Sequence, residues 1–185
     1  MALIELDICS VSFDPGAAAV RDATGVERDL VHAAVGRESL DTTGICAACL
    51  GRERLLVPIR SRSALAGLTP DLELLREGCD RLGLLGCFVY SVPSPAGRLA
   101  ARMFAPSIGV PEDIANANST ACLAAMLARD DVSEITVDMG DSLGSPATIT
   151  ASAQPDGAGL RVRVGGLAKI AATRPVSLAE LDHSN

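Results

Sequence analysis

The chain has 185 residues, of which 48% are apolar, 21% charged and 2% aromatic, and its net charge is −7. This is the composition of a globular domain whose core is built from aliphatic side chains. An acidic chain with a single lysine, Lys169, and few aromatic rings argues against nucleic-acid binding, which needs clustered cations and stacking platforms. No apolar run has bilayer-spanning length, and no basic segment opens the chain, so we expect a cytoplasmic protein without membrane contact.

The N-terminal part predicts a strand, a loop and a short helix. Apolar and polar residues alternate from Leu3 to Asp14, as in a strand that Pro15-Gly16 ends. Residues 17–25 are small and variable and predict a loop. From Glu27 to Arg37 the apolar residues recur on one face, which predicts an amphipathic helix. His32 falls on this helix, where a lone histidine is expected at the surface.

The middle of the chain predicts two pairs of strands with a helix between them. Ile45–Leu50 and Arg54–Arg60 alternate like the two arms of a hairpin. A helix is predicted from Asp71 to Leu82, since its leucines share one face and Gly83 follows its last turn. The apolar run Leu84–Val92 predicts a buried strand, and Arg98–Phe104 predicts its hairpin partner.

The C-terminal third predicts further strands. The loop Gly140–Pro146 follows the first of them, and the segment Pro155–Gly159 predicts a turn. Beyond Arg174 the sequence predicts a tail with a short helical segment. The predicted strands are Ser133–Met139, Ala147–Ala153, Leu160–Val164 and Leu167–Ala172.

One apolar stretch organises this prediction. Every residue from Ala121 to Ala128 is apolar, whereas a surface helix would show a polar face at every third or fourth position. The stretch is too short to span a bilayer, and its small side chains let a sheet approach closely. We therefore predict an α+β fold, in which an antiparallel-rich mixed sheet curls around one buried central helix.

The polar residues just before this helix are the candidates for chemistry. Asn, Ser and Thr side chains cap free backbone N–H groups, and a helix N-terminus attracts carboxylate or phosphate groups. The same residues would also suit a well-capped helix without any ligand, so their spacing leaves both interpretations open. The residues are Glu112, Asp113, Asn116, Asn118, Ser119 and Thr120.

The six cysteines are expected to be reduced and mostly buried in a cytoplasmic chain. Cys46 and Cys49 form a lone CxxC motif without the second pair that a zinc ribbon needs. A thioredoxin-type motif would begin a helix, whereas LDTTGICAACLG is typical of a strand. We therefore expect no metal site.

The segment RMFAPSIGVPEDIANANSTACLAAML resembles the signature of the PhzF-like isomerases of phenazine biosynthesis, which reads R-x-F-A-P-x-x-G-x-x-E-D. GDSLGSPATITASA and LRVRVGGLAKIA are similar to later strands of that family. The resemblance runs from about Asp41 onward, within a single domain predicted over residues 1–185 with a divergent lead-in at 1–40. The residues that match in order are Arg102, Phe104, Ala105, Pro106, Gly109, Glu112 and Asp113.

The resemblance implies an isomerase or epimerase of secondary metabolism that moves a proton on a small carboxylated metabolite without a cofactor. Its fold would be half of a diaminopimelate-epimerase-like, two-half architecture. Asp113 is the catalytic candidate, and Glu112 is a local substitute for the base. The residues expected to bind substrate are Gly109, Asn116, Asn118, Ser119 and Thr120.

Two departures from the family pattern qualify this hypothesis. Where the family has a substrate-contacting serine, this chain has Asn118. The G-N-P and G-H-A motifs that accompany the acid/base glutamate of the N-terminal half do not occur. The chain therefore resembles the C-terminal half alone, and the glutamate would come from a second chain, either in a homodimer or from a partner that supplies the N-terminal half. The alternative is a non-catalytic binding or stabilising subunit that has lost the chemistry.

Overall fold

The computed structural model describes residues 8–37, 40–156 and 159–169. Ten strands of this part form one mixed sheet, in the order β1-β10-β9-β8-β6-β5-β4-β3-β2, with β7 paired beside β6. The pairs β4–β5 and β6–β8 are parallel and the others are antiparallel. The strands are β1 (Ile8–Phe13), β2 (Ala19–Asp22), β3 (Cys46–Leu50), β4 (Arg52–Ile59), β5 (Cys87–Ser91), β6 (Arg98–Ala105), β7 (Val110–Asp113), β8 (Glu134–Met139), β9 (Ala147–Asp156) and β10 (Gly159–Lys169).

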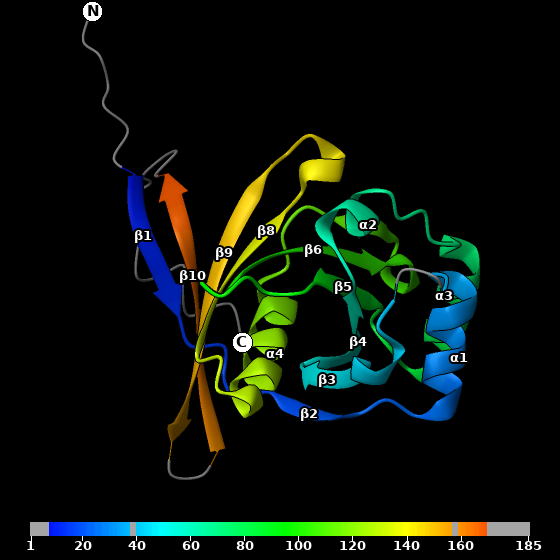
Figure 1. Ribbon diagram of the computed structural model, residues 1–185, viewed down its shortest axis with the longest axis horizontal. Helices are drawn as coiled ribbons and strands as arrows, with labels where there is room; N and C mark the ends of the chain where they lie inside the picture. Colours follow the sequence, from blue (N-terminus) through cyan, green and yellow to red (C-terminus); the bar gives the residue numbers. More distant parts are fainter. Residues whose placement is uncertain (1–7, 38–39, 157–158, 170–185) are drawn as a thin grey trace, which may run out of the picture.

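The sheet curls around helix α4 (Ala117–Leu127), as Figure 1 shows. This helix contacts β9 and β10 near one end of the strand order and β2 and β3 at the other end, which only a curved sheet allows. Every side chain from Ser119 to Ala125 is buried. The apolar run of this helix is stable here because strands cover the side chains from Ser119 to Ala125, whereas Asn118 on the first turn is exposed.

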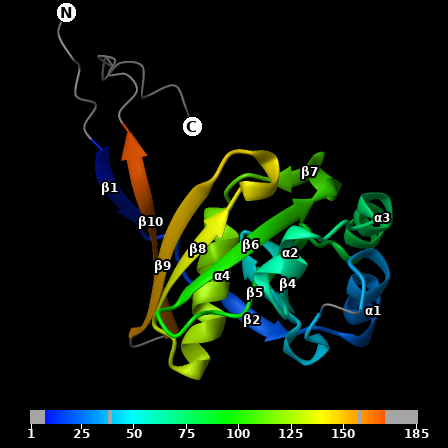
Figure 2. The ribbon, with the colours of Figure 1, turned by 45° about the horizontal axis from the view of Figure 1, so that its top comes forward.

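The other helices lie on the opposite face of the sheet, away from α4 (Figures 1 and 2). A second apolar core forms there, where Leu75 and Cys79 of α3 pack with Leu55 and Val57 of β4. The helices are α1 (Gly25–Ala34), α2 (Arg62–Ala66) and α3 (Leu72–Leu82), and short 3-10 turns cover Thr42–Gly44, Pro106–Ile108, Ala128–Asp130 and Asp141–Leu143.

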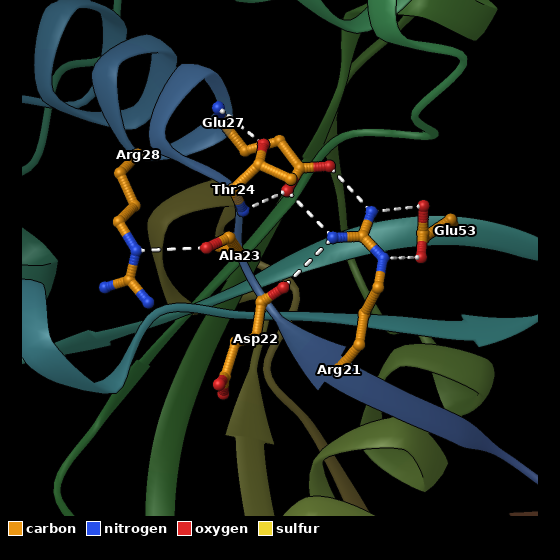
Figure 3. Close-up of polar contacts among 7 residues, drawn as sticks. All are labelled: Arg21, Asp22, Ala23, Thr24, Glu27, Arg28 and Glu53. Atoms are coloured by element: carbon orange, nitrogen blue, oxygen red, sulfur yellow. Dashed lines mark hydrogen bonds and ion pairs between the residues drawn. The ribbon is translucent and has the colours of Figure 1, made fainter.

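An ion-pair network fixes the short edge strand β2 to its neighbours (Figure 3). Arg21 donates to Glu27 at 2.9 and 2.7 Å and to Glu53 at 2.8 and 2.7 Å. Glu27 also accepts the backbone N–H of Thr24 at 2.7 Å, which completes a capping box at the start of α1. The hydrogen bonds from Arg21 outweigh the effect of burial and lower the pKa of Glu27 to about 2.

Most of the predicted elements are confirmed, but one predicted loop and one predicted pair of strands are wrong. The segment expected as a loop at residues 17–25 contains strand β2, because pairing with β3 stabilises a sequence with little strand propensity of its own. The two predicted closing strands are one strand, β10, which runs through Gly165-Gly166. A Cβ at Gly165 would lie 2.6 Å from the carbonyl oxygen of Val11, so this glycine permits close approach to β1 rather than breaking the strand.

Smaller differences concern element ends. Helix α1 stops at Ala34 rather than Arg37, and α2 was not expected. Pro155 belongs to β9 rather than to a turn. His32 is half-buried, with no hydrogen-bond partner for either ring nitrogen among the described groups, rather than free at the surface. The predicted strand start at Leu3, the last residues of the closing strand and the tail lie outside the described residues.

The CxxC motif lies within β3, as predicted. Cys46 and Cys49 are an odd number of residues apart on a strand, so their side chains point to opposite faces of the sheet. Both thiols are free, and among residues 8–37, 40–156 and 159–169 no three metal-ligating side chains form a cluster. None of the helices described in those ranges is long and apolar enough to cross a membrane.

Candidate active site

Asp113 is held at the N-terminus of the buried helix. It is the last residue of β7, opposite Met103 of β6. Asn116 is the N-cap of α4, where its side-chain oxygen accepts the backbone N–H of Ser119 at 2.8 Å. The amide nitrogen of Asn116 donates to the carboxylate of Asp113 at 2.9 Å. One asparagine therefore caps the helix and fixes the orientation of the neighbouring carboxylate.

Glu112 points to the other face of the sheet. Arg102 donates to its two carboxylate oxygens at 2.8 and 2.7 Å, and the hydroxyl of Ser142 donates to one of them. The side chains of Arg102 and Glu112 are only 13% and 11% exposed. Burial acts to raise the pKa of Glu112, but the hydrogen bonds from Arg102 and Ser142 outweigh it and hold this pKa below its ordinary value.

These two neighbouring carboxylates are separated because alternate residues of a strand face opposite sides of the sheet. Asp113 lies on the face of α4, whereas Glu112 lies on the face of α2. A carboxylate that is bound by an arginine and has a lowered pKa is a poor general base at neutral pH. The ion pair with Arg102 therefore disfavours Glu112 as a local substitute for the base. The sequence presented this segment as a loop, in which no alternation was expected.

The predicted substrate-binding residues divide into two groups. Asn116 and Asn118 lie beside Asp113 at the start of α4, and Asn118 is exposed. Ser119 and Thr120 are fully buried, and their hydroxyls donate to the sulfur of Met103 and to the carbonyl oxygen of Asn116. Their side chains support the helix rather than face a ligand.

Gly109 is not brought to the helix N-terminus. It precedes β7, at the opposite end of that strand from Asp113. Its φ of +78° ends the turn at Pro106–Ile108, and a Cβ there would meet no atom within 4 Å. The left-handed backbone conformation is by itself a sufficient reason for a glycine at this position.

A cleft of about 960 Å³ opens beside the N-terminus of α4, with Ala115 and Ala117 on its wall. No local pattern in the sequence predicts this cleft, because it forms where β9 and β10 separate. The two strands pair only as far as Thr150 and Gly165, and Figure 1 shows β10 continuing with β1 while β9 continues with β8. Apolar side chains line much of the cleft: Val11, Phe13, Ile149, Val164 and Leu167.

The fold and the Asp113–Asn116 pair define an α+β protein whose curled sheet encloses a helix with a polar N-terminus. A family model described as phenazine biosynthesis-like protein (PhzC-PhzF) matches residues 14–174, and the chain belongs to this family. The resemblance of the segment from Arg102 to Asp113 is thereby confirmed.

Two curated relatives carry the name of uncharacterized isomerase. The protein from Deinococcus radiodurans is 32% identical over 134 residues, which cover 68% of this chain and 43% of the relative. The Escherichia coli K12 protein YddE is 27% identical over 88 residues, or 48% of this chain and 30% of the relative. The chain thus matches less than half the length of these relatives.

Two solved structures share the fold. A PhzF-family phenazine biosynthesis protein from Bacillus anthracis superposes with a TM-score of 0.73 at 16% identity, over 87% of this chain and 58% of the other. A predicted epimerase from Pseudomonas aeruginosa has a TM-score of 0.63 at 25% identity, over 91% and 59%. Both cover most of this chain and little more than half of the larger protein.

Proposed function

We propose that this chain forms part of a cofactor-independent isomerase or epimerase that moves a proton on a small carboxylated metabolite. The observation that supports the proposal most directly is the position of Asp113. Its carboxylate is oriented by Asn116 at the N-terminus of α4, and Ala115 and Ala117 of the same segment line a cleft of about 960 Å³. Acid–base catalysis requires a carboxyl group held in a defined orientation within reach of a substrate.

In this proposal the start of α4 orients the carboxylate of the substrate. Free backbone N–H groups and the positive end of the helix dipole favour an anion there. Asn118 is exposed on the first turn and can donate its amide to the substrate. The apolar walls of the cleft exclude water from the remainder of the substrate, which strengthens the charge-assisted hydrogen bonds.

We further propose that a second chain supplies the other acid/base group and that this chain is one half of a two-half architecture. The partial coverage of the relatives supports the idea, because the chain spans only 43% of the Deinococcus protein. Exposed apolar side chains on β1 and β10 support it as well: Val11 is 48% exposed, Phe13 49% and Leu167 80%. Such a patch is typical of a surface that another chain covers.

The test of the active site is exchange of substrate protons with solvent deuterium. Asp113→Asn preserves the shape of the side chain and removes its charge, so we expect about a hundredfold loss of exchange in a folded protein. Asn118→Ala should mainly raise KM. The matched control is Asp29→Asn, which alters an exposed aspartate on α1 and should leave exchange unchanged.

Two outcomes of this experiment and one separate measurement would contradict parts of the proposal. Full exchange by Asp113→Asn would remove the loop from the mechanism. Absence of exchange with every carboxylated substrate, even with the N-terminal half of a relative supplied, would favour the non-catalytic binding subunit. Light scattering that shows a stable monomer at micromolar concentration would contradict the requirement for a second chain.

A further inference from the structure

A second cavity of about 420 Å³ lies on the sheet face opposite α4. Its walls come from α2, from the middle of β6 and from the end of β8 with the turn that follows. The volume falls within the range typical of small-molecule sites. Because the cavity and Asp113 lie on opposite faces of the sheet, it is separate from the proposed active site.

Two arginines share one carboxylate at the edge of this cavity. Asp138 accepts hydrogen bonds from Arg98 at 2.9 and 2.8 Å and also from Arg62, so a single carboxylate serves two guanidinium groups. Arg102, which also lines the cavity, is neutralised by Glu112. Arg62 is 56% exposed and Asp138 only 13%. Arg98 is exposed to a similar degree, at 58%, but it does not line the cavity, whereas Arg62 does. Arg62 is therefore the cation that can turn toward a ligand while Asp138 keeps Arg98 as its partner.

The carboxylate of Asp141 brings a negative charge to the same cavity. Asp141 lines the cavity and is exposed, and no hydrogen bond or ion pair joins its carboxylate to another of the described residues. The cavity therefore presents one available cation, Arg62, and one available anion, Asp141. Two opposite charges inside a small cavity match a zwitterion better than a simple anion or cation.

The remainder of the lining is apolar and small. Leu65 and Ala66 of α2, Ala100 of β6 and Met139 of β8 form this part of the wall. Leu65 and Met139 are buried behind this wall, whereas Ala66 is exposed and Ala100 half-buried. The two alanines therefore leave space in the cavity and give an aliphatic group a surface to cover. No aromatic ring lines the cavity, which favours an aliphatic ligand over one that stacks.

We propose that this cavity binds an α-amino acid with a short aliphatic side chain. The carboxylate of the ligand pairs with Arg62, its ammonium group pairs with Asp141, and its side chain lies against Ala66 and Ala100. The Ser142 hydroxyl, which contacts Glu112, brings the cavity to the strand that ends in Asp113. A ligand in this cavity would therefore lie close to the strand that carries Asp113 and could influence the proposed active site. Binding of the ligand does not require that site to be catalytically active.

The experiment is calorimetric titration of the full chain with L-leucine, alongside three truncated probes. L-leucinamide lacks the carboxylate, 4-methylvalerate lacks the amine, and glycine lacks the side chain. Each charged contact is a charge-assisted hydrogen bond, so loss of either group should weaken binding by about tenfold or more. Arg62→Met and Asp141→Asn should each do the same. Arg81→Met, which removes an exposed arginine of α3, is the control and should bind as the unmodified chain does.

A steric variant tests the location without removing a charge. Ala66→Leu fills the cavity from an exposed position and should abolish binding while unfolding in urea stays unchanged. Ala33→Leu makes the same change on the exposed face of α1 and should have no effect on binding. The proposal is overturned if L-leucine shows no saturable binding at about 10 mM. It is equally overturned if Ala66→Leu binds L-leucine like Ala33→Leu, or if leucinamide and 4-methylvalerate bind as well as L-leucine.

Discussion

The ion pair between Arg21 and Glu27 should make the stability of this protein depend on pH in a defined window. The Glu27 side chain is 6% exposed, and its pKa lies at about 2 instead of the ordinary 4.5. A carboxyl group with a lowered folded pKa contributes stability above its unfolded pKa, and loses that contribution as the pH falls through the folded pKa. The contribution of Glu27 should therefore be complete above about pH 4.5 and gone near pH 2.

The magnitude follows from the same two values. At about 1.4 kcal/mol per pKa unit, the difference between 4.5 and about 2 corresponds to about 3 kcal/mol. Arg21 is 42% exposed and also pairs with Glu53, so solvent screening makes this an upper limit. We expect Glu27→Gln to lower the free energy of unfolding by about 1–3 kcal/mol at pH 7.

Urea unfolding of both proteins at several pH values between 7 and 2.5 measures this effect. The difference between them should be constant down to about pH 5 and then shrink toward zero. Glu77→Gln, an exposed position on α3, is the matched control and should differ little from the unmodified chain at any pH. A Glu27→Gln difference that stays the same from pH 7 to pH 2.5 would refute the coupling between the charge of Glu27 and folding.

The remaining predictions concern the core. Leu123→Ala on α4 should cost about 2–5 kcal/mol in urea unfolding, because the fully buried side chain leaves a cavity; a loss below about 0.5 kcal/mol would mean that the helix is peripheral. Arg54 is 1% exposed, has no carboxylate partner among the described residues, and donates only through Nη2, to the carbonyl oxygens of Leu50 and Arg52. Because relief of its desolvation offsets the loss of these two hydrogen bonds, Arg54→Met should be close to neutral, and a loss above about 2 kcal/mol would contradict this. Burial raises the pKa values of Cys79 and Cys122 to about 11, so at pH 8 a thiolate-selective reagent should modify both only after unfolding, as mass spectrometry can show.

The elements of the fold could be predicted where the local pattern agrees with the final environment. The apolar run around Leu123 identified a helix without a solvent face, and the spacing at Asp71 identified a capped helix with Gly83 after it. The prediction failed where a distant segment decided the outcome. Strand β2 exists because β3 pairs with it, and Gly165 lies within a strand because β1 approaches there.

The candidate site was only partly predictable for the same reason. The sequence pointed to Asp113 and Asn116 as neighbours at a helix N-terminus. These two residues are only three positions apart, so the start of the helix is enough to bring their side chains together. It could not find the cleft between β9 and β10, nor the cavity beneath α2. Both form between segments that are far apart in the chain, and no pattern within a short stretch of sequence predicts a gap between such segments.

What the sequence by itself determined, therefore, is the set of local elements, the family signature and the identity of the polar residues before α4. What only the tertiary structure decided is where those residues point. Pairing of β7 with β6 turned a segment expected as a loop into a strand, and the alternation of that strand placed Asp113 beside α4 and Glu112 beside Arg102. The direction of a side chain on a strand depends on its register with a partner, and that register is fixed by contacts that no local sequence pattern contains.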